Sequence, residues 1–292
     1  MPKARTSKIT ALLAGAFLAS CASPPPAPDP VLRAAALART REAEDAFSAG
    51  RYDEACLRYG EALAVHRSIG SAEGMARCLV NLATVRLAAS DAPGARDYLD
   101  AMDRCLATVR VSNPVELDRG DLPDLRARAA CLRARLEADA GHIEAAWKAL
   151  GTEAPGSAKP ETLALRRLLE ARLHLRQSNN ASSLEAARQA LKLCRKAGDR
   201  PGEADAHRYA ARALLRSGQP AAALDEFSAA LALDQDLARP PKVAADLGGM
   251  AEAARATGDE TRARACEKRQ SEVREAAAPT QDEEGGAATA RE

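Results

Sequence analysis

The chain has 292 residues, of which 46% are hydrophobic but only 3% aromatic, and its 42 basic and 41 acidic residues nearly balance. Alanine, the best helix former, supplies much of the apolar content, and the runs of β-branched and aromatic residues typical of strands are missing. Residues 1–20 hold three basic residues and no acid, so the remaining chain has 39 basic and 41 acidic residues. This composition favours an all-α fold and argues against generic nucleic-acid binding.

The N-terminus has the order of a bacterial export signal. A basic start with Lys3, Arg5 and Lys8 precedes the apolar segment 9–19, which has the length of a signal-peptide core and is too short to span a bilayer. The next residues, Leu18-Ala19-Ser20-Cys21, resemble a bacterial lipobox. This resemblance implies that residues 1–20 are cleaved as a lipoprotein signal peptide and that Cys21 carries acyl chains such as palmitate. A signal peptide cleaved without lipidation is the alternative.

The segments that flank the folded region differ from it in composition. Residues 21–30 contain the predicted lipidated cysteine and then a Pro-rich stretch, which we expect to be an extended, semi-rigid tether. Ala22 directly after the cysteine favours the outer membrane over the inner membrane, by resemblance to Gram-negative lipoproteins of this type. Residues 276–292 are polar and of low complexity, and we expect them to be disordered.

Between these segments, helix–turn–helix patterns recur along residues 31–275. The expected turns include Ala49-Gly50-Arg51-Tyr52, Ser90-Asp91-Ala92-Pro93, Gly141-His142-Ile143, a longer turn over 178–183, Ser217-Gly218-Gln219-Pro220 and Thr257-Gly258-Asp259. One alanine marks the second helix of each unit, at positions 55, 95, 146, 187, 223 and 263. Longer loops are expected over 111–123 and 151–160.

The clearest unit covers residues 207–231, where Ala211, Ala223, Phe227 and Ala230 occupy the packing positions. This order resembles a tetratricopeptide repeat (TPR), a helical hairpin of about 34 residues. The resemblance implies a right-handed solenoid of about six hairpins with a concave surface, in which His207 faces the core. The alanine spacings of 36–51 residues are all longer than the simplest repeat. An irregular helical bundle is the alternative fold.

The sequence offers little that predicts catalysis. The four histidines are scattered and form no HExxH pair, the remaining six cysteines form no CxxC motif, and no GxSxG is present. We therefore expect no catalytic role, no cofactor and no metal site. The six cysteines are expected to be small buried apolar residues, although Cys105 and Cys131 lie on consecutive helices and could form a disulfide.

Arginines recur at the positions that line the concave face in repeats of this kind. Arg135, Arg172 and Arg212 hold equivalent positions in three units. Because guanidinium groups bind carboxylates in a bidentate manner, we expect an acidic or carboxylate-ended peptide there. The full set of expected groove residues is Asn81, Arg135, Arg172, Arg176, Arg208, Tyr209, Arg212 and Arg216. The alternative is a solvated Arg-rich face.

Together these features predict a lipid-anchored, periplasm-facing TPR scaffold that binds another envelope protein or peptide. Lipoproteins with such repeats resemble pilotins and components of outer-membrane assembly or cell-wall regulation. Two other functions remain open from the sequence. One is an architectural protein that associates with itself near the membrane, and the other is a hydrolase with a cleft containing His142 or His174.

Overall fold

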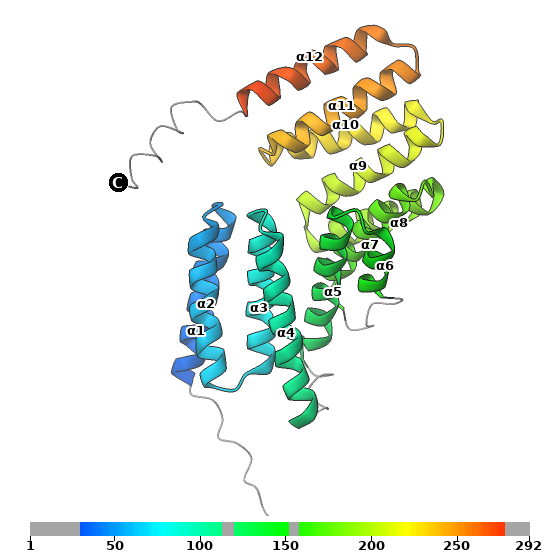
Figure 1. Cartoon of the computed structure of the whole chain (residues 1–292). Helices are drawn as coiled ribbons and strands as arrows, with labels where there is room; N and C mark the ends of the chain where they lie inside the picture. Colours follow the sequence, from blue (N-terminus) through cyan, green and yellow to red (C-terminus); the bar gives the residue numbers. More distant parts are fainter. Residues whose placement is uncertain (1–29, 113–119, 152–157, 278–292) are drawn as a thin grey trace, which may run out of the picture.

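The computed structural model describes residues 30–112, 120–151 and 158–277, which form twelve α-helices and no strand. Consecutive helices pair into six hairpins that follow one another in chain order (Figure 1). The first three hairpins are α1 (Pro30–Ser48) with α2 (Tyr52–Ser68), α3 (Ala72–Ala88) with α4 (Ala92–Ser112), and α5 (Leu122–Asp139) with α6 (Ile143–Leu150). The last three are α7 (Pro160–Arg176) with α8 (Asn180–Ala197), α9 (Arg200–Arg216) with α10 (Pro220–Asp236), and α11 (Pro240–Ala256) with α12 (Glu260–Ala276).

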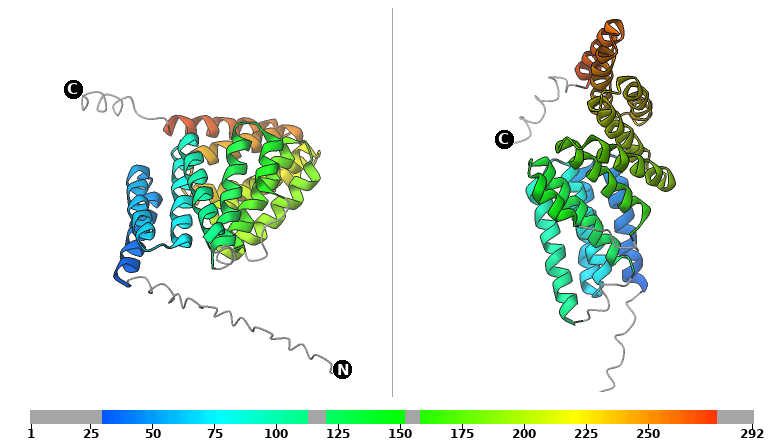
Figure 2. Two further views of the ribbon diagram at one scale, coloured as in Figure 1. Left: turned by 60° about the horizontal axis from the view of Figure 1, so that its bottom comes forward. Right: turned by 90° about the vertical axis from the view of Figure 1, so that its right-hand side faces the viewer.

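The hairpins stack into a solenoid. Each helix packs against its neighbours in the chain, and the first helices of successive hairpins also contact one another from α3 through α5, α7 and α9 to α11. The right-hand view of Figure 2 shows the array rising from the N-terminal hairpin at one end to the C-terminal hairpin at the other. The predicted all-α, TPR-like solenoid of about six repeats is therefore confirmed, and its first helices share the inner side of the array.

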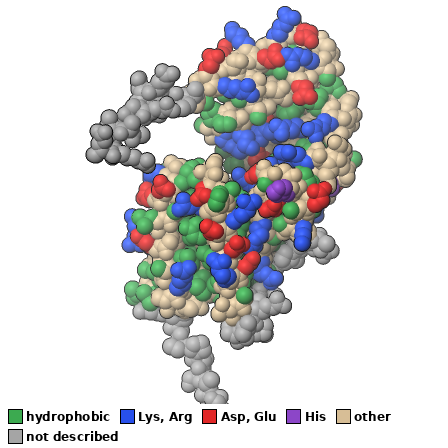
Figure 3. Space-filling model, in the orientation of Figure 1, with side chains coloured by type: hydrophobic (Ala, Val, Ile, Leu, Met, Phe, Trp, Pro, Cys, Tyr) green, Lys and Arg blue, Asp and Glu red, His purple; other side chains and the backbone are tan. Residues whose placement is uncertain are grey.

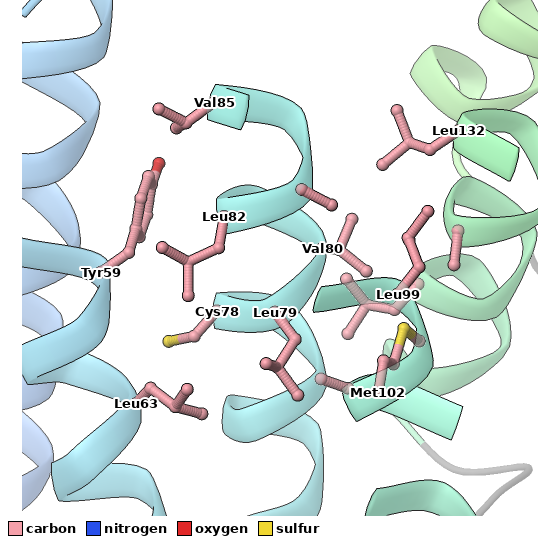
Figure 4. Packing of buried hydrophobic residues seen from close by; sticks show 14 of the residues in the cluster. Tyr59, Leu63, Cys78, Leu79, Val80, Leu82, Val85, Leu99, Met102 and Leu132 are labelled. Carbon is pink, nitrogen blue, oxygen red and sulfur yellow. The ribbon is translucent and has the colours of Figure 1, made fainter. Parts of the chain in front are cut away.

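The core is divided into clusters along the solenoid. The largest involves helices α1 to α5 and contains Tyr59 and Leu63 facing Leu82 of α3, with Leu99 beyond them on α4 (Figure 4). A second large cluster joins α9 to α12 around Phe227, which is 1% exposed. Between them lie two smaller clusters rich in alanine. Each hairpin thus buries its apolar face against its neighbours, as expected for a repeat protein.

The turn inside each hairpin contains one residue with positive φ. Glycine fills this position in four hairpins, at 50, 141, 218 and 258, where it adopts the left-handed conformation without a Cβ clash. Ser90 and Ser178 fill it in the other two, with φ of 61° and 59°. Side chains then cap several helix starts, for example Asp259 Oδ1, which accepts a hydrogen bond from the Arg262 amide at 2.9 Å.

The expected longer turn over 178–183 is not found. Helix α8 already begins at Asn180, so this turn has the same length as the turns before α10 and α12. The Asn179 side chain caps the helix by accepting a hydrogen bond from the Ser182 amide. Ser183 lies inside the helix, and its hydroxyl donates to the Ala171 carbonyl of α7 at 2.8 Å. The serines that suggested a turn are therefore a helix start and a buried interhelical contact.

All six cysteines in the described part of the chain are free, so the disulfide that the sequence left open between Cys105 and Cys131 is not formed. Four of the six are buried, but Cys56 and Cys105 are only partly buried. None of the helices that the structure describes is both long and apolar enough to cross a membrane. The predicted signal peptide, Cys21, most of the tether and nearly all of the predicted disordered tail lie outside the described residues.

Candidate functional site: two cavities on the concave face

A cavity of about 580 Å³ lies on the inner side of α5, α7, α9 and α11. We call it the cationic cavity, because seven basic and only two acidic side chains line it. The basic residues are Arg135, Arg172, Arg176, Arg212, Arg216, Arg239 and Lys242, and the acidic residues are Asp139 and Asp205. Figure 3 shows Lys and Arg side chains gathered in the hollow between the N-terminal and C-terminal hairpins. The lining also includes an apolar strip on α7, formed by Leu165, Leu168, Leu169 and Leu175.

The two acids of the cationic cavity are already held by neighbouring bases. Asp139 forms an ion pair with Arg172 at 2.6 Å and a longer one with Arg135 at 3.7 Å. Asp205 lies 3.2 Å from Lys242 and 3.6 Å from Arg239. Burial opposes the ionisation of Asp205, but the charges of Lys242, Arg208 and Arg239 outweigh it and hold the pKa of this carboxyl below its usual range.

Three guanidinium groups of the cavity have no carboxylate partner among the described residues. Arg176 and Arg212 form no ion pair among the described residues, and both are exposed. In the part of the chain that the structure describes, Arg216 donates only to the Leu175 carbonyl, at 2.7 Å. The cavity therefore has basic groups in excess, and these groups can bind an anionic ligand without first losing a carboxylate partner.

Tyr209 lines the same cavity from α9. Burial is the main cause that raises the pKa of its phenol, and the charge of Asp205 adds to the rise, so the hydroxyl is protonated at neutral pH. Its ring packs against a small cluster of alanines that includes Ala171 and Ala210. Tyr209 thus presents one wall of the cavity, and it can offer a hydrogen bond to a ligand.

A second cavity of about 690 Å³ adjoins the first on the inner side of α1, α3, α5 and α7, and Leu165 lines both. We call it the N-terminal cavity. Its charge balance is reversed, with the acidic residues Glu44, Asp121, Asp124, Glu161 and Asp199 and the basic residues Arg77, Arg128 and Lys159. Asp121 accepts hydrogen bonds from Lys159 at 2.8 Å and from Arg77 at 2.7 Å. These two hydrogen bonds are the main reason that the pKa of Asp121 is lowered.

Six of the eight predicted groove residues meet in the cationic cavity, namely Arg135, Arg172, Arg176, Tyr209, Arg212 and Arg216. Asn81 lines the N-terminal cavity instead. Their role in binding a ligand stays a prediction, but their placement on one concave surface is what such a role requires. Arg239 and Lys242 also line the cavity but were not expected from the sequence, and they lie at the start of α11, the next first helix along the solenoid.

Arg208 is not available to a groove ligand, and this corrects the sequence-based expectation. Its side chain is 4% exposed and points into the contact between α9, α10 and α11. Its Nε donates to Asp246 Oδ1 at 2.7 Å, and its other nitrogens contact Asp205 and Asp234. Asp234 follows the buried Ala230 by four residues, so helical spacing could have revealed a carboxylate in the core.

The histidines do not form a common site. His207 is buried, as predicted, and its Nδ1 lies 2.6 Å from Glu226. His142 contacts Glu137, and His174 packs against the Trp147 ring. Neither His142 nor His174 is among the residues that line the two concave cavities. Within the described residues, no group of three or more His, Cys, Asp and Glu side chains could hold a metal ion.

Comparisons with known proteins bear on the fold. Neither a protein-family model nor a curated protein matches the sequence. Among solved structures, BtubC (BKLC) from P. vanneervenii matches with a TM-score of 0.55 and 19% identity, over 86% of this chain and 95% of that one. Two structures of a Podosopora anserina putative kinesin light chain with nearly identical TPR-like repeats match at 16% identity. They cover 83% and 86% of this chain and 94% and 98% of theirs.

The TM-scores of the two Podosopora anserina structures, 0.34 and 0.35, are too low to carry an argument. The likeness to BtubC, at its low identity, concerns the fold alone. It agrees with the six stacked hairpins and the shared inner face described above. The chain therefore has the fold of a TPR-type helical repeat protein.

Proposed function

We propose that the protein is a lipid-anchored scaffold of the bacterial cell envelope that binds an acidic or carboxylate-ended segment of another envelope protein. The observation that carries this proposal is the cationic cavity, where seven basic side chains face only two acids. A cavity with this excess of positive charge selects an anionic ligand by charge complementarity. The planar arginine fork further favours carboxylates, because it can donate two parallel hydrogen bonds to one group.

The rest of the concave face indicates how such a ligand would lie. The leucines of α7 provide an apolar strip beside the arginines, so an apolar side chain next to the acidic residues would be buried there. The N-terminal cavity continues the surface with a small excess of acids. A peptide that spans both cavities would therefore place its acidic part over α9 and α11 and a neutral or basic part over α3 and α5.

Anchoring rests on the sequence. The basic, apolar and lipobox segments occur in the order of a lipoprotein signal, and the Pro-rich stretch after Cys21 leads directly to the start of α1 at Pro30. Several acyl chains on Cys21, at about 0.8 kcal/mol per buried methylene, would hold the protein stably at a membrane. Ala22 leads us to propose the outer membrane, with the solenoid facing the periplasm.

Crosslinking and pull-down from envelope membranes test the groove. The variant Arg176→Glu/Arg212→Glu reverses two charges that have no ion pair among the described residues, so the fold should remain intact while partner recovery falls at least about tenfold. The matched control Arg264→Glu/Arg269→Glu makes the same charge change on exposed positions of α12 and should recover the partner like wild type. Equal recovery by both variants would refute the groove assignment.

Anchoring and oligomeric state need separate measurements. The Cys21→Ser variant should move from the membrane fraction to the soluble envelope fraction, and retention in the membrane would contradict lipidation at this residue. Light scattering on the protein without its lipid distinguishes a monomeric scaffold from the self-associating architectural protein. A stable dimer at low micromolar concentration would favour the second function.

A further inference from the structure

The end of the last helix lies beside the cationic cavity. Val273, Ala276 and Ala277 line a small apolar pocket of about 310 Å³ together with Val243 and Arg239. Arg239 also lines the cationic cavity, next to Lys242 at the start of α11. The chain beyond Ala277 therefore starts at a pocket that shares Arg239 with the cationic cavity.

The sequence after this point is acidic. Residues 278–292 contain Asp282, Glu283, Glu284 and Glu292 and the single base Arg291, a net charge of −3. The three adjacent acids follow Ala277 by five to seven residues. An extended chain covers about 3.3–3.6 Å per residue, so these acids can reach roughly 17–25 Å from the end of α12. Arg239 lines both the pocket at the end of α12 and the cationic cavity, so the nearest bases of the cavity lie within this reach.

We propose that Asp282, Glu283 and Glu284 bind in the cationic cavity of their own chain and compete there with the partner. This inference rests on the proposed function, because it takes the same cavity as the ligand site. Lys242 and Arg239 are the nearest bases, and Arg212 and Arg216 on α9 follow along the cavity. Arg212 has no carboxylate partner among the described residues, so a carboxylate from the tail would supply one.

The competition follows from tethering. A short flexible linker gives a tethered group an effective concentration in the millimolar range. Three carboxylates without a shaped apolar anchor are a weak ligand, since exposed ion pairs contribute little each. The tail would then occupy the cavity for much of the time when no partner is present, and a partner with an additional apolar side chain on the α7 leucines would displace it. The acidic tail thus sets a higher threshold of affinity that a partner must exceed in order to occupy the cavity.

A zero-length carbodiimide crosslink tests the contact directly in the full mature chain purified in detergent. We expect mass spectrometry to find Lys242 joined to an acid within 282–284. A Lys242–Asp205 crosslink, between groups 3.2 Å apart, shows that the reagent reaches this site. Finding only the Lys242–Asp205 product would overturn the proposal. Tail crosslinks that appear only between chains, with a yield that rises with protein concentration, would overturn it as well.

Binding of a fluorescent tetra-glutamate peptide tests the competition. The variant Asp282→Asn/Glu283→Gln/Glu284→Gln should bind this probe about three to ten times more tightly than wild type, the range expected for loss of a weak tethered competitor. The control Asp225→Asn/Glu252→Gln/Glu275→Gln removes three exposed acids from α10, α11 and α12 and should bind like wild type. Equal binding by wild type and both variants would refute the tail contact and leave the proposed function standing. No binding by any of the three would refute the proposed acidic ligand itself, while the crosslink would still decide where the tail lies.

Discussion

One buried guanidinium, that of Arg208, lies among three carboxylates where α9, α10 and α11 meet. Asp234 and Asp246 are fully buried, and both contact it. Burial is the main cause that raises the pKa of Asp246 to about 6, and the neighbouring Asp234 adds to the rise, while Arg208 opposes it. Around this cluster, Arg239 contacts Asp234, and both Arg239 and Lys242 contact Asp205. A proton can therefore be retained in the cluster well above the pH at which an exposed carboxyl loses it.

This raised pKa has a defined effect on stability. The folded state binds a proton at Asp246 more tightly than the unfolded state, so its contribution to stability is complete below about pH 4 and is lost as the pH rises through about 6. Asp246→Asn removes the titration. We expect the free energy of unfolding of wild type relative to this variant to fall by on the order of 2 kcal/mol between pH 4 and pH 7, at about 1.4 kcal/mol per pKa unit.

Urea unfolding at several pH values measures this difference. Other carboxyls, such as Asp121 and Asp205, have lowered pKa values and change stability in the opposite direction, but both chains share them, so they cancel in the comparison. A constant difference between wild type and Asp246→Asn across this pH range would show that Asp246 does not titrate with a raised pKa.

Gly249 shows how closely the last hairpins pack. A Cβ built on it would lie 2.3 Å from the Phe227 ring, whereas a Cβ on Gly60 of α2 would meet no atom within 4 Å. Gly249→Ala should therefore destabilise the fold by about 1–3 kcal/mol through overpacking. Gly60→Ala should stabilise it by about 0.8–1.0 kcal/mol, because alanine is the better helix former. Thermal unfolding of the two variants should give shifts of opposite sign, and stabilisation by both would mean that Phe227 can move aside.

At the scale of elements, the connections use the left-handed conformation repeatedly. The links between hairpins use it at Gly70 and Gly198, with φ of 66° and 71°, but alanine holds the corresponding conformation at Ala238, with φ of 49°. An L-residue pays roughly 1–2 kcal/mol in this region, and glycine does not.

Ala238→Gly should therefore stabilise the protein by about 0.5–1 kcal/mol. The substitution relieves the backbone strain of the folded state, and the larger entropy of glycine in the unfolded chain offsets part of this gain. Ala232→Gly, at an exposed position inside α10, makes the same chemical change in a helix and should destabilise by roughly 0.5–1 kcal/mol. Chemical unfolding of both variants measures the contrast. Destabilisation by Ala238→Gly would show that the link before α11 carries no strain.

The elements were well predicted because their signals are local. Alanine at the packing positions and Gly or Asp in the turns specify helix starts and ends, and five of the six turns agree with the expectation. The expected turn before α8 was longer than the observed one, because Ser182 and Ser183 resemble turn residues. The buried Ser183 hydroxyl is satisfied by a hydrogen bond to the Ala171 carbonyl on the facing helix, and the local sequence does not show that partner.

The site was predictable only in part. Arg208 and Arg212 are one helical turn apart, so periodicity places both on nearly the same face. The structure separates them, because Asp234 and Asp246 lie 26 and 38 residues further along the chain and draw Arg208 into the core. Nothing in the local pattern around α9 contains that information. The same holds for Arg239 and Lys242, which join the cavity only because α11 packs beside α9.

At the scale of the whole molecule, the solenoid changes its internal chemistry along its length. Helices α1 to α5 share a cluster in which leucines, valines and a tyrosine pack with alanines. Helices α9 to α12 share the cluster around Phe227, and the Arg208 ion pairs add to the contact of α9 with α10 and α11. Between these parts, the cluster that joins α7, α8 and α9 has only four buried members, Ala171, Ala186, Ala187 and Ala210, with Leu184 and Tyr209 packed against them.

These four alanines have a mechanical consequence. A methyl group makes few dispersion contacts, so sliding one such surface over another costs less than shearing interdigitated leucines or separating buried charges. We therefore expect the apolar contact between α7, α8 and α9 to resist shear less than the leucine-rich cluster of α1 to α5 does. The cationic cavity extends across that joint, from Arg135 on α5 to Lys242 on α11. Shear between these helices would change the distance between the basic side chains on either side of the joint, and with it the width of the cavity.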